Sequence, residues 1–259
     1  MSTTIPTATA TATSTAPQAF PSAPAPATPD ALGPMASRRV SILLSFTAGF
    51  VDTFGFVALF GLFTAHVTGN FVLIGAAIAG AGSAAVLGKL LALPAFVAGV
   101  VATRAWQLRC EREGRASGVA VVVVQLLLLL AFMAGGVLAT PFLHQDGWQV
   151  IVVGLLGVLG MSVQNAASRS TFSKMSPSTV MTGNVTQISM DLIDLLTKAP
   201  GSAAAATRVR GMWPAITAFA IGSLGGALAF KPMGFWAIVA PVAALALVLN
   251  ALTQTSPAP

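Results

Sequence analysis

Residues 63–75 read Phe-Thr-Ala-His-Val-Thr-Gly-Asn-Phe-Val-Leu-Ile-Gly, a polar run between hydrophobic runs, with no charged residue. Far along the chain, residues 179–186 repeat its centre as Thr-Val-Met-Thr-Gly-Asn-Val-Thr. Glycine permits close approach of the backbone, and threonine or asparagine can cap the start of a helix. Each Thr-Gly-Asn element therefore predicts a helix that begins within an apolar environment. We expect the rest of the chain to position these two elements relative to each other.

The composition indicates a membrane protein. Of 259 residues, 55% are hydrophobic and 8% are charged, against about 25% charged in a soluble domain. The mean hydropathy is +0.84. The net charge of +6 does not indicate a nucleic-acid partner, because most basic residues lie in short segments between apolar runs, as cytoplasmic loops do. The expected partner is therefore the lipid bilayer, and no nucleic acid is expected.

Enzyme chemistry has little support in the sequence. The single cysteine, Cys110, excludes an intramolecular disulfide and belongs to no cluster of metal ligands. The sequence contains no Ser-His-Asp constellation, no phosphate-binding glycine loop and no carboxylate pair in a soluble domain. We therefore expect no catalytic residue, no metal and no cofactor.

The chain divides into a tail, a membrane domain and a short end. Residues 1–37 are almost entirely Thr, Ala, Pro and Ser, which is typical of a disordered tail. Residues 38–252 form a single predicted membrane domain, and residues 253–259 form a C-terminal tail. Within the domain, apolar stretches of the roughly 20 residues needed to cross a bilayer cover 40–62, 86–106, 118–139, 149–167, 212–230 and 234–252. The fold class is therefore predicted to be all-α, a polytopic helical membrane protein.

The membrane domain reads as two related halves. With residues 68–70 aligned on 182–184 and one residue of slack, the run Gly-Phe-Val-Asp at 49–52 falls opposite Ser-Val-Gln-Asn at 162–165. After a longer insertion in the second half, Phe96 falls opposite Phe219. The predicted repeats cover about residues 40–140 and about 149–252. Internal duplication of this kind is common in transporter folds.

The topology depends on whether the Thr-Gly-Asn elements, at 63–82 and 178–196, cross the bilayer. If both enter and return, the domain has six full spans plus two re-entrant or short helices, and its halves are inverted. Both termini are then cytoplasmic in a bacterial inner membrane, and only Lys89 and Lys231 lie outside. If both elements cross, there are eight spans and parallel repeats, which places four arginines within 104–115 outside. The positive-inside rule favours six spans. The topology with eight spans stays an alternative, because the stretch 62–80 is long and apolar enough to cross the bilayer.

Asp52 and His66 are the titratable candidates for a site. Asp52 lies inside the first span, where a charged side chain costs at least about 2.5 kcal/mol. It predicts a proton or cation site or a substrate contact; the alternative is a structural hydrogen bond to another helix. His66 titrates in the physiological range, although a single histidine at the end of a span is commonly interfacial. The second element has Val180 at the matching position.

The two Thr-Gly-Asn elements supply the remaining candidates. Helices that begin inside the bilayer leave free N–H groups there, and such backbone is tolerated only in protein interior or beside a cavity. Two elements entering from opposite faces would meet near the midplane and frame a polar site. The alternative is that small residues merely pack two continuous helices together. The predicted solute or ion site comprises Asp52, His66, Thr68, Gly69, Asn70, Gln164, Asn165, Thr182, Gly183 and Asn184.

Other polar and small residues have structural interpretations. Gln125 predicts an interhelical hydrogen bond, and Gly222 and Gly226 form a GxxxG motif that predicts a helix-packing contact. Asp194 and Lys198 have the spacing of a pair on a helix surface, so the nearby Asp191 and Asp194 are expected at the membrane interface.

The Gly-Phe-Val-Asp run at 49–52, followed by His-Val-Thr-Gly-Asn at 66–70, resembles the YoaK family of bacterial integral membrane proteins. The resemblance covers about residues 38–252, with Val67 where the family often has methionine. It implies a multi-pass bacterial inner-membrane protein and transfers neither a substrate nor a catalytic residue.

Together these features predict a transporter or channel for a small polar solute or ion, with its site between the two halves. The alternative is a non-transporting membrane scaffold or accessory protein, whose polar residues only hold helices together. The sequence leaves the solute open, and also whether the protein is a homo-oligomer.

Overall fold

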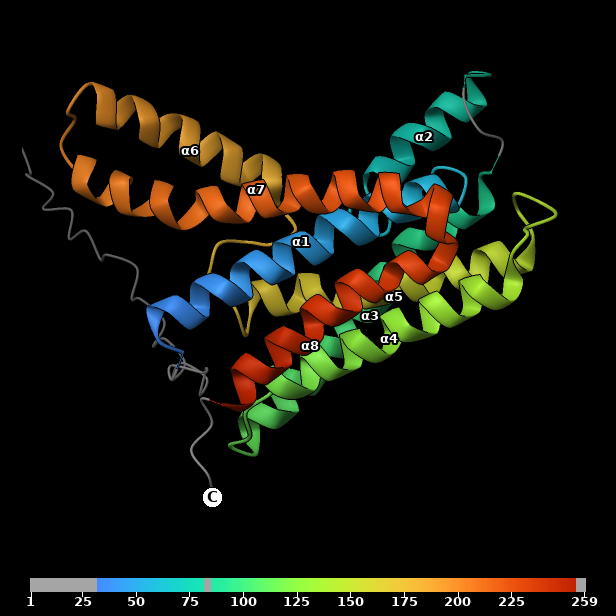
Figure 1. The fold of residues 1–259 in the computed structure, drawn as a ribbon, viewed down its shortest axis with the longest axis horizontal. Coiled ribbons are helices and arrows are strands. Elements are labelled where there is room, and N and C mark those ends of the chain that lie inside the picture. Colours follow the sequence, from blue (N-terminus) through green and yellow to red (C-terminus); the bar gives the residue numbers. More distant parts are fainter. Residues whose placement is uncertain (1–31, 82–84, 255–259) are drawn as a thin grey trace, which may run out of the picture.

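The computed structural model describes residues 32–81 and 85–254, and this part of the chain is helical without strands (Figure 1). The all-α prediction is therefore confirmed. The predicted disordered tail and C-terminal tail fall mostly outside the described residues. The helices are α1 (Pro34–Ala58), α2 (Gly69–Ile78), α3 (Leu87–Arg112), α4 (Gly118–Ala139), α5 (Trp148–Arg169), α6 (Met181–Leu196), α7 (Ser202–Met233), the 3-10 helix η1 (Gly234–Ile238) and α8 (Val239–Thr253).

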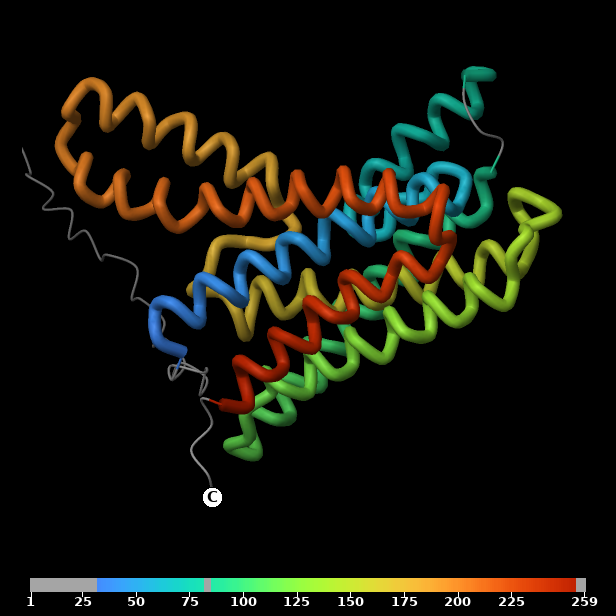
Figure 2. The backbone as a smooth tube through the Cα atoms, in the orientation of Figure 1, coloured from blue at the N-terminus to red at the C-terminus, as the bar shows by residue number. Residues whose placement is uncertain are grey.

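Five helical stretches in the described chain are long and apolar enough to cross a membrane: α1, α3, α4, α5 and the continuous run Ser202–Thr253. The last has 52 residues, which as a straight helix would measure about 78 Å, more than twice a bilayer core. The chain reverses at Gly234, whose φ is +54°, so α8 runs back toward the end where α7 begins (Figure 1). The start of α1 and the end of α8 consequently lie at the same end of the bundle (Figure 2).

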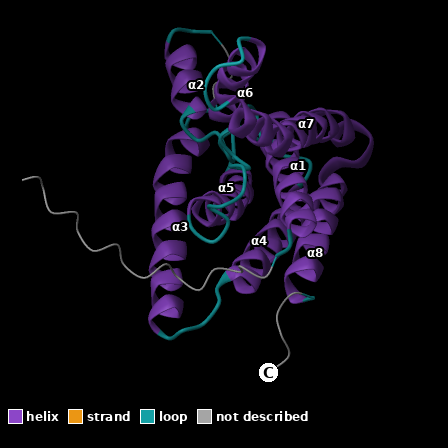
Figure 3. Ribbon diagram, turned by 90° about the vertical axis from the view of Figure 1, so that its left-hand side faces the viewer, coloured by secondary structure: helices purple, strands orange, loops and turns teal. Residues whose placement is uncertain are grey.

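The two Thr-Gly-Asn elements form short helices. The 10 residues of α2 extend about 15 Å and the 16 residues of α6 about 24 Å, both less than the roughly 30 Å of a bilayer core. Both helices lie on the same side of the bundle (Figure 3). They begin in the middle of the molecule and diverge toward opposite ends (Figure 1). Helix length thus favours elements that enter without crossing. The number of spans and the relation between the halves stay predictions.

α1 is the central helix, and its closest partner is α7. A Cβ added at Gly222 or Gly226 of α7 would overlap the carbonyl oxygen of Phe46 or Phe50 on α1. Such overlap means that the two backbones touch, which confirms the predicted packing role of the GxxxG motif. Next to this crossing, the ring of Phe54 packs edge-to-face against three other rings. These belong to Phe132 of α4, Phe230 of α7 and Phe235 of η1, with centroids 6.0, 5.5 and 5.2 Å away, so the contacts join α1 to all three helices.

The boundaries of α1 and α7 differ from those predicted. α1 ends at Ala58, because Phe60 and Gly61 have positive φ values, 52° and 84°, that turn the chain out of the helix. α7 begins at Ser202, ten residues before the predicted span. The reason is an ion pair: the Arg208 guanidinium donates from Nε to Oδ2 of Asp191 at 3.1 Å, joining α7 to α6. The Asp191 side chain is fully buried in this contact, and its predicted position at the membrane interface stays a prediction.

Single cysteines can test the course of the short helices. In a Cys110→Ser background, Ala81→Cys after α2 should react with an impermeant thiol reagent in intact cells. Ala203→Cys after α6 should react only after permeabilisation, because both positions are exposed and the short helices return to the side they entered from. The Cys110→Ser parent alone supplies the unlabelled control. Labelling of both positions from one side would mean that α2 and α6 cross the bilayer.

Candidate functional site

Asp52 of α1 organises the loop that leads into α2. One carboxylate oxygen, Oδ1, accepts hydrogen bonds from the backbone N–H groups of Ala65, at 2.6 Å, and His66, at 3.2 Å. The other, Oδ2, contacts Nδ1 of the His66 ring at 2.6 Å. Only 4% of Asp52 is exposed. These partners offset the cost of burying a carboxylate, and they fix the position of the His66 ring.

The pairing of His66 with Asp52 was not predicted. Its ring also packs edge-on against Phe219 of α7, with 6.0 Å between centroids. Because Nδ1 is bonded to Asp52, Nε2 is the ring nitrogen left for another partner, and His66 is one of the residues that line a cavity. A proton on Nδ1 is the assignment that satisfies an ionised Asp52, because a carboxylate accepts and does not donate. In that tautomer Nε2 is a proton acceptor.

Asn70 and Asn184 perform the same structural task in their two elements. The Asn70 amide exchanges two hydrogen bonds with the backbone of Phe63, seven residues earlier, both at 2.9 Å. The Asn184 amide donates to the carbonyl of Pro177, also seven residues earlier, at 2.8 Å. Both side chains are buried and hold the preceding loop against the helix start. Neither is directed to the cavity wall.

The starts of the two short helices also differ from expectation. No side-chain cap forms at Thr68, the residue before α2, or at Val180, the residue before α6, so the predicted capping by Thr or Asn is wrong. In α2 the first amides are instead satisfied by tight turns, such as Gly69 N–H to the His66 carbonyl at 2.8 Å. In α6 the N–H groups of residues 181–183 have no hydrogen-bond acceptor among the described residues. The α6 start therefore carries free donors and a partial positive charge.

A cavity of about 240 Å³ lies between the two elements. The first element contributes residues 65–68 and the second contributes residues 179–182; Leu93, Phe96 and Asn165 complete the wall. Four predicted site residues are thus brought together: His66, Thr68, Asn165 and Thr182. Asn165 accepts a hydrogen bond from the Thr179 hydroxyl at 2.7 Å, which links α5 to the second element.

The remaining predicted site residues lie outside this cavity. Gln164 is buried, accepts from Gln125 of α4 at 2.6 Å, and donates to the Leu44 carbonyl of α1 at 2.8 Å. The prediction of an interhelical hydrogen bond for Gln125 is thereby confirmed. Gly69 packs closely beneath the Phe63 ring, where an added Cβ would come to 3.0 Å, whereas an added Cβ at Gly183 would meet only the Val180 side chain at an ordinary 3.6 Å.

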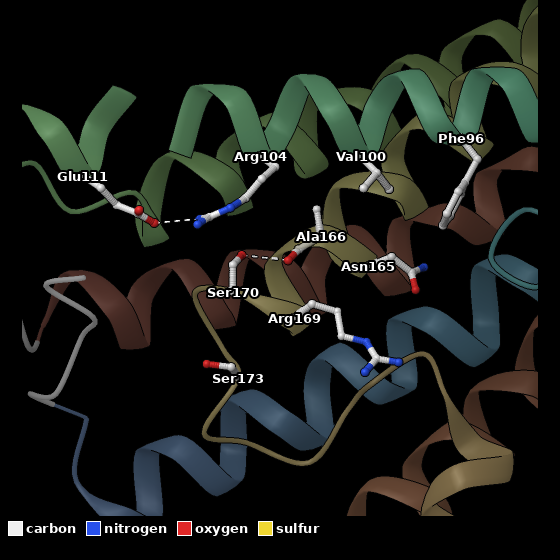
Figure 4. A pocket seen from close by; sticks show the side chains of 9 residues that line it. All are labelled: Phe96, Val100, Arg104, Glu111, Asn165, Ala166, Arg169, Ser170 and Ser173. Carbon is white, nitrogen blue, oxygen red and sulfur yellow. Dashed lines mark hydrogen bonds and ion pairs between the residues drawn. The ribbon is translucent and has the colours of Figure 1, made fainter. Parts of the chain in front are cut away.

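A second and larger cavity, about 560 Å³, adjoins the first between α3 and α5. Figure 4 shows Phe96 and Asn165 at its inner end, and both residues also line the smaller cavity. At its outer part Arg104 pairs with Glu111 at 2.7 Å. Arg169 has no acidic partner within the described chain. This larger cavity, which we call the vestibule, therefore carries a net positive charge.

Sequence reasoning missed the vestibule and the role of Phe96. The alignment of the halves did pair Phe96 with Phe219. Phe96 lines the smaller cavity, and Phe219 packs against the ring of His66. In the described residues, no three His, Cys, Asp or Glu side chains gather as metal ligands would.

Comparisons with known proteins agree with this membrane architecture. The family described as "Protein of unknown function (DUF1275)" matches residues 40–251. The chain is also similar to the UPF0700 transmembrane protein YoaK of Bacillus subtilis (strain 168), with 31% identity over 150 residues, 58% of this chain. The aligned region spans 64% of that relative, less than two thirds of its length. No solved structure matches the chain.

Proposed function

The chain belongs to the DUF1275 family and is a polytopic membrane protein, and on that premise we propose that it transports a small polar solute or ion. The observation that carries the proposal is the junction of α2 and α6. Two short helices begin beside each other, around a cavity that holds one oriented histidine. Non-helical backbone at membrane depth is characteristic of transporter sites between two halves of a molecule.

The Asp52–His66 pair supports coupling to protons or cations. Asp52 holds Nδ1 of His66, which leaves Nε2 to exchange a proton with the cavity. A buried carboxylate beside a titratable ring also lowers the cost of placing a positive charge on that ring. Protonation of His66 would therefore change the charge of the cavity without moving the backbone that holds Asp52.

The solute class follows from the donors. The free N–H groups of α6 and the unpaired charge of Arg169 favour a solute with an anionic or strongly accepting group. A volume of about 240 Å³ lies below the roughly 300–1,000 Å³ of drug-sized sites, so the solute has few heavy atoms. The positive vestibule would concentrate such solutes at the entrance.

The orientation is part of the same proposal. Six crossings, with α2 and α6 as re-entrant helices, place both termini on the cytoplasmic side of a bacterial inner membrane, as the positive-inside rule favours. The vestibule would then open to the cytoplasm. The rival function, a scaffold without transport, requires the same folded chain but no flux.

Filling the cavity tests the proposal. Thr182→Ile adds apolar volume to the wall beside the α6 start, and we expect flux to fall at least about tenfold through lost space and lost solute contacts. The matched control is Thr186→Ile, one turn further on and outside the cavity. The assay uses proteoliposomes with an internal pH dye, challenged with gradients of chloride, nitrate, formate, acetate and phosphate. Wild-type flux no greater than that of empty liposomes would favour the scaffold.

A further inference from the structure

A third cavity, about 350 Å³, lies where α1 begins, and it shares no wall residue with the two cavities of the proposed transport site. Three segments far apart in the sequence form it: the first turns of α1, the loop between α5 and α6, and the early part of α7. The polar wall consists of Ser37, Arg38, Ser41, Lys174, Ser176 and Arg210.

The charge of this cavity is one-sided. Each of the three segments contributes one cation, namely Arg38, Lys174 and Arg210, and no acidic residue among those described lines the wall. Neither Arg38 nor Arg210 forms an ion pair with an acid of the described chain. Like charges held around one cavity repel one another, so a bound anion would stabilise this arrangement.

Of the three buried, unpartnered hydroxyls in the described part of α1, those of Ser41, Ser45 and Thr47, only that of Ser41 belongs to a residue of this wall. The Ser41 hydroxyl is buried, with 7% of the residue exposed, and has no hydrogen-bond partner among the described residues. A buried hydroxyl without a partner is uncommon in folded proteins, and Ser41 lines the cavity. The start of α1 at Pro34, which has no side-chain cap, adds the partial positive charge of a helix N-terminus to the same wall.

We propose that this cavity binds a phosphate group, held by Arg38 and Arg210 and by the Ser41 hydroxyl. Arginine recognises phosphate through parallel N–H donors, and a serine hydroxyl supplies a further donor. The cavity lies at the end of the bundle that holds both described chain ends, where basic pockets between membrane helices bind anionic headgroups. The phosphate belongs to an anionic lipid or to a free phosphate ion. The lipid carries this group as a singly charged diester, whereas the free ion has no ester bonds.

The test uses the purified full chain in a neutral detergent. Native mass spectrometry and thermal unfolding are recorded with phosphatidylglycerol, with phosphatidylcholine, and with inorganic phosphate against chloride at equal ionic strength. We expect phosphatidylglycerol or inorganic phosphate to form a retained adduct and to raise the unfolding temperature by several degrees. Stabilisation by phosphatidylglycerol alone identifies the lipid as the source, and stabilisation by inorganic phosphate identifies the free ion.

Matched variants separate the cavity from diffuse attraction. The double variant Arg38→Gln with Arg210→Gln should lower the affinity for the anion at least tenfold. Arg39→Gln with Arg112→Gln removes the same charge from positions outside the wall and should leave binding unchanged. Ser41→Ala keeps all three cations and should weaken binding by a smaller factor, which keeps the proposal testable if the double variant misfolds. Equal losses in both double variants, or binding of neither anion by the wild type, would overturn the assignment.

Discussion

Asp52→Asn will abolish solute flux while leaving the protein folded in the membrane. The amide oxygen of asparagine can still accept from the Ala65 and His66 N–H groups, so the loop before α2 keeps its position. The amide nitrogen, however, is a donor where Oδ2 was an acceptor. Nδ1 of His66 must then accept, and the ring proton moves to Nε2.

This change of tautomer reverses the chemistry that His66 offers to the cavity. Nε2 becomes a donor and no longer takes a proton from the solute side, and the negative charge that favours a protonated ring is lost. Loss of the group that orients a metal-bound histidine typically costs about 10- to 100-fold in affinity or activity, and we expect the loss of flux here to be at least that large. Because the loop stays hydrogen-bonded, the loss should fall on transport and spare membrane insertion.

The measurement compares flux in proteoliposomes with the elution profile of the purified protein. His66→Gln should lose flux to a similar degree, since it removes the titratable ring itself. Glu113→Gln removes an acidic charge from an exposed position and should retain wild-type flux. Undiminished flux in Asp52→Asn would refute the role of the Asp52–His66 pair in transport.

Long apolar runs were the part of the fold that the sequence predicted well. The predicted span at 118–139 coincides with α4, because the polar segments on either side of its Val- and Leu-rich run define where the helix begins and ends. Where charged residues occupy the first turns of a helix, as in α7, the predicted start was wrong. The first half of α7 contains Arg208, whose place in a helix depends on a buried partner in α6, and no local pattern signals that pairing.

The candidate site shows a similar division. The alignment of the halves identified Asn70 and Asn184 as equivalent, and the structure gives them the same contact with a residue seven positions earlier. It did not distinguish Gln164 from Asn165, because neighbouring helical residues point about 100° apart and only the packing decides which faces a cavity. The Asp52–His66 contact depends on how a loop folds back along α1, which spacing alone does not specify.

Gly222→Ala is expected to destabilise the α1–α7 crossing. The added methyl group would overlap the carbonyl oxygen of Phe46, and a backbone atom cannot rotate away as a side chain can. Overpacking of this kind typically costs about 1–3 kcal/mol, which exceeds the gain of up to about 1 kcal/mol from replacing glycine within a helix. Unfolding in graded denaturing detergent, followed by circular dichroism, would measure the difference.

Gly225→Ala is the matched control, because its methyl group would meet the Phe50 ring at 3.4 Å, an ordinary contact. A Gly222→Ala protein as stable as this control would show that close backbone approach is not needed at the crossing. The expected outcome also reaches the site. Phe46 lies less than two turns before Asp52 on α1, so separating α1 from α7 would draw the Asp52–His66 pair away from Phe219 of α7, against which the His66 ring packs. Flux should therefore fall together with stability in Gly222→Ala, whereas Gly225→Ala should retain both.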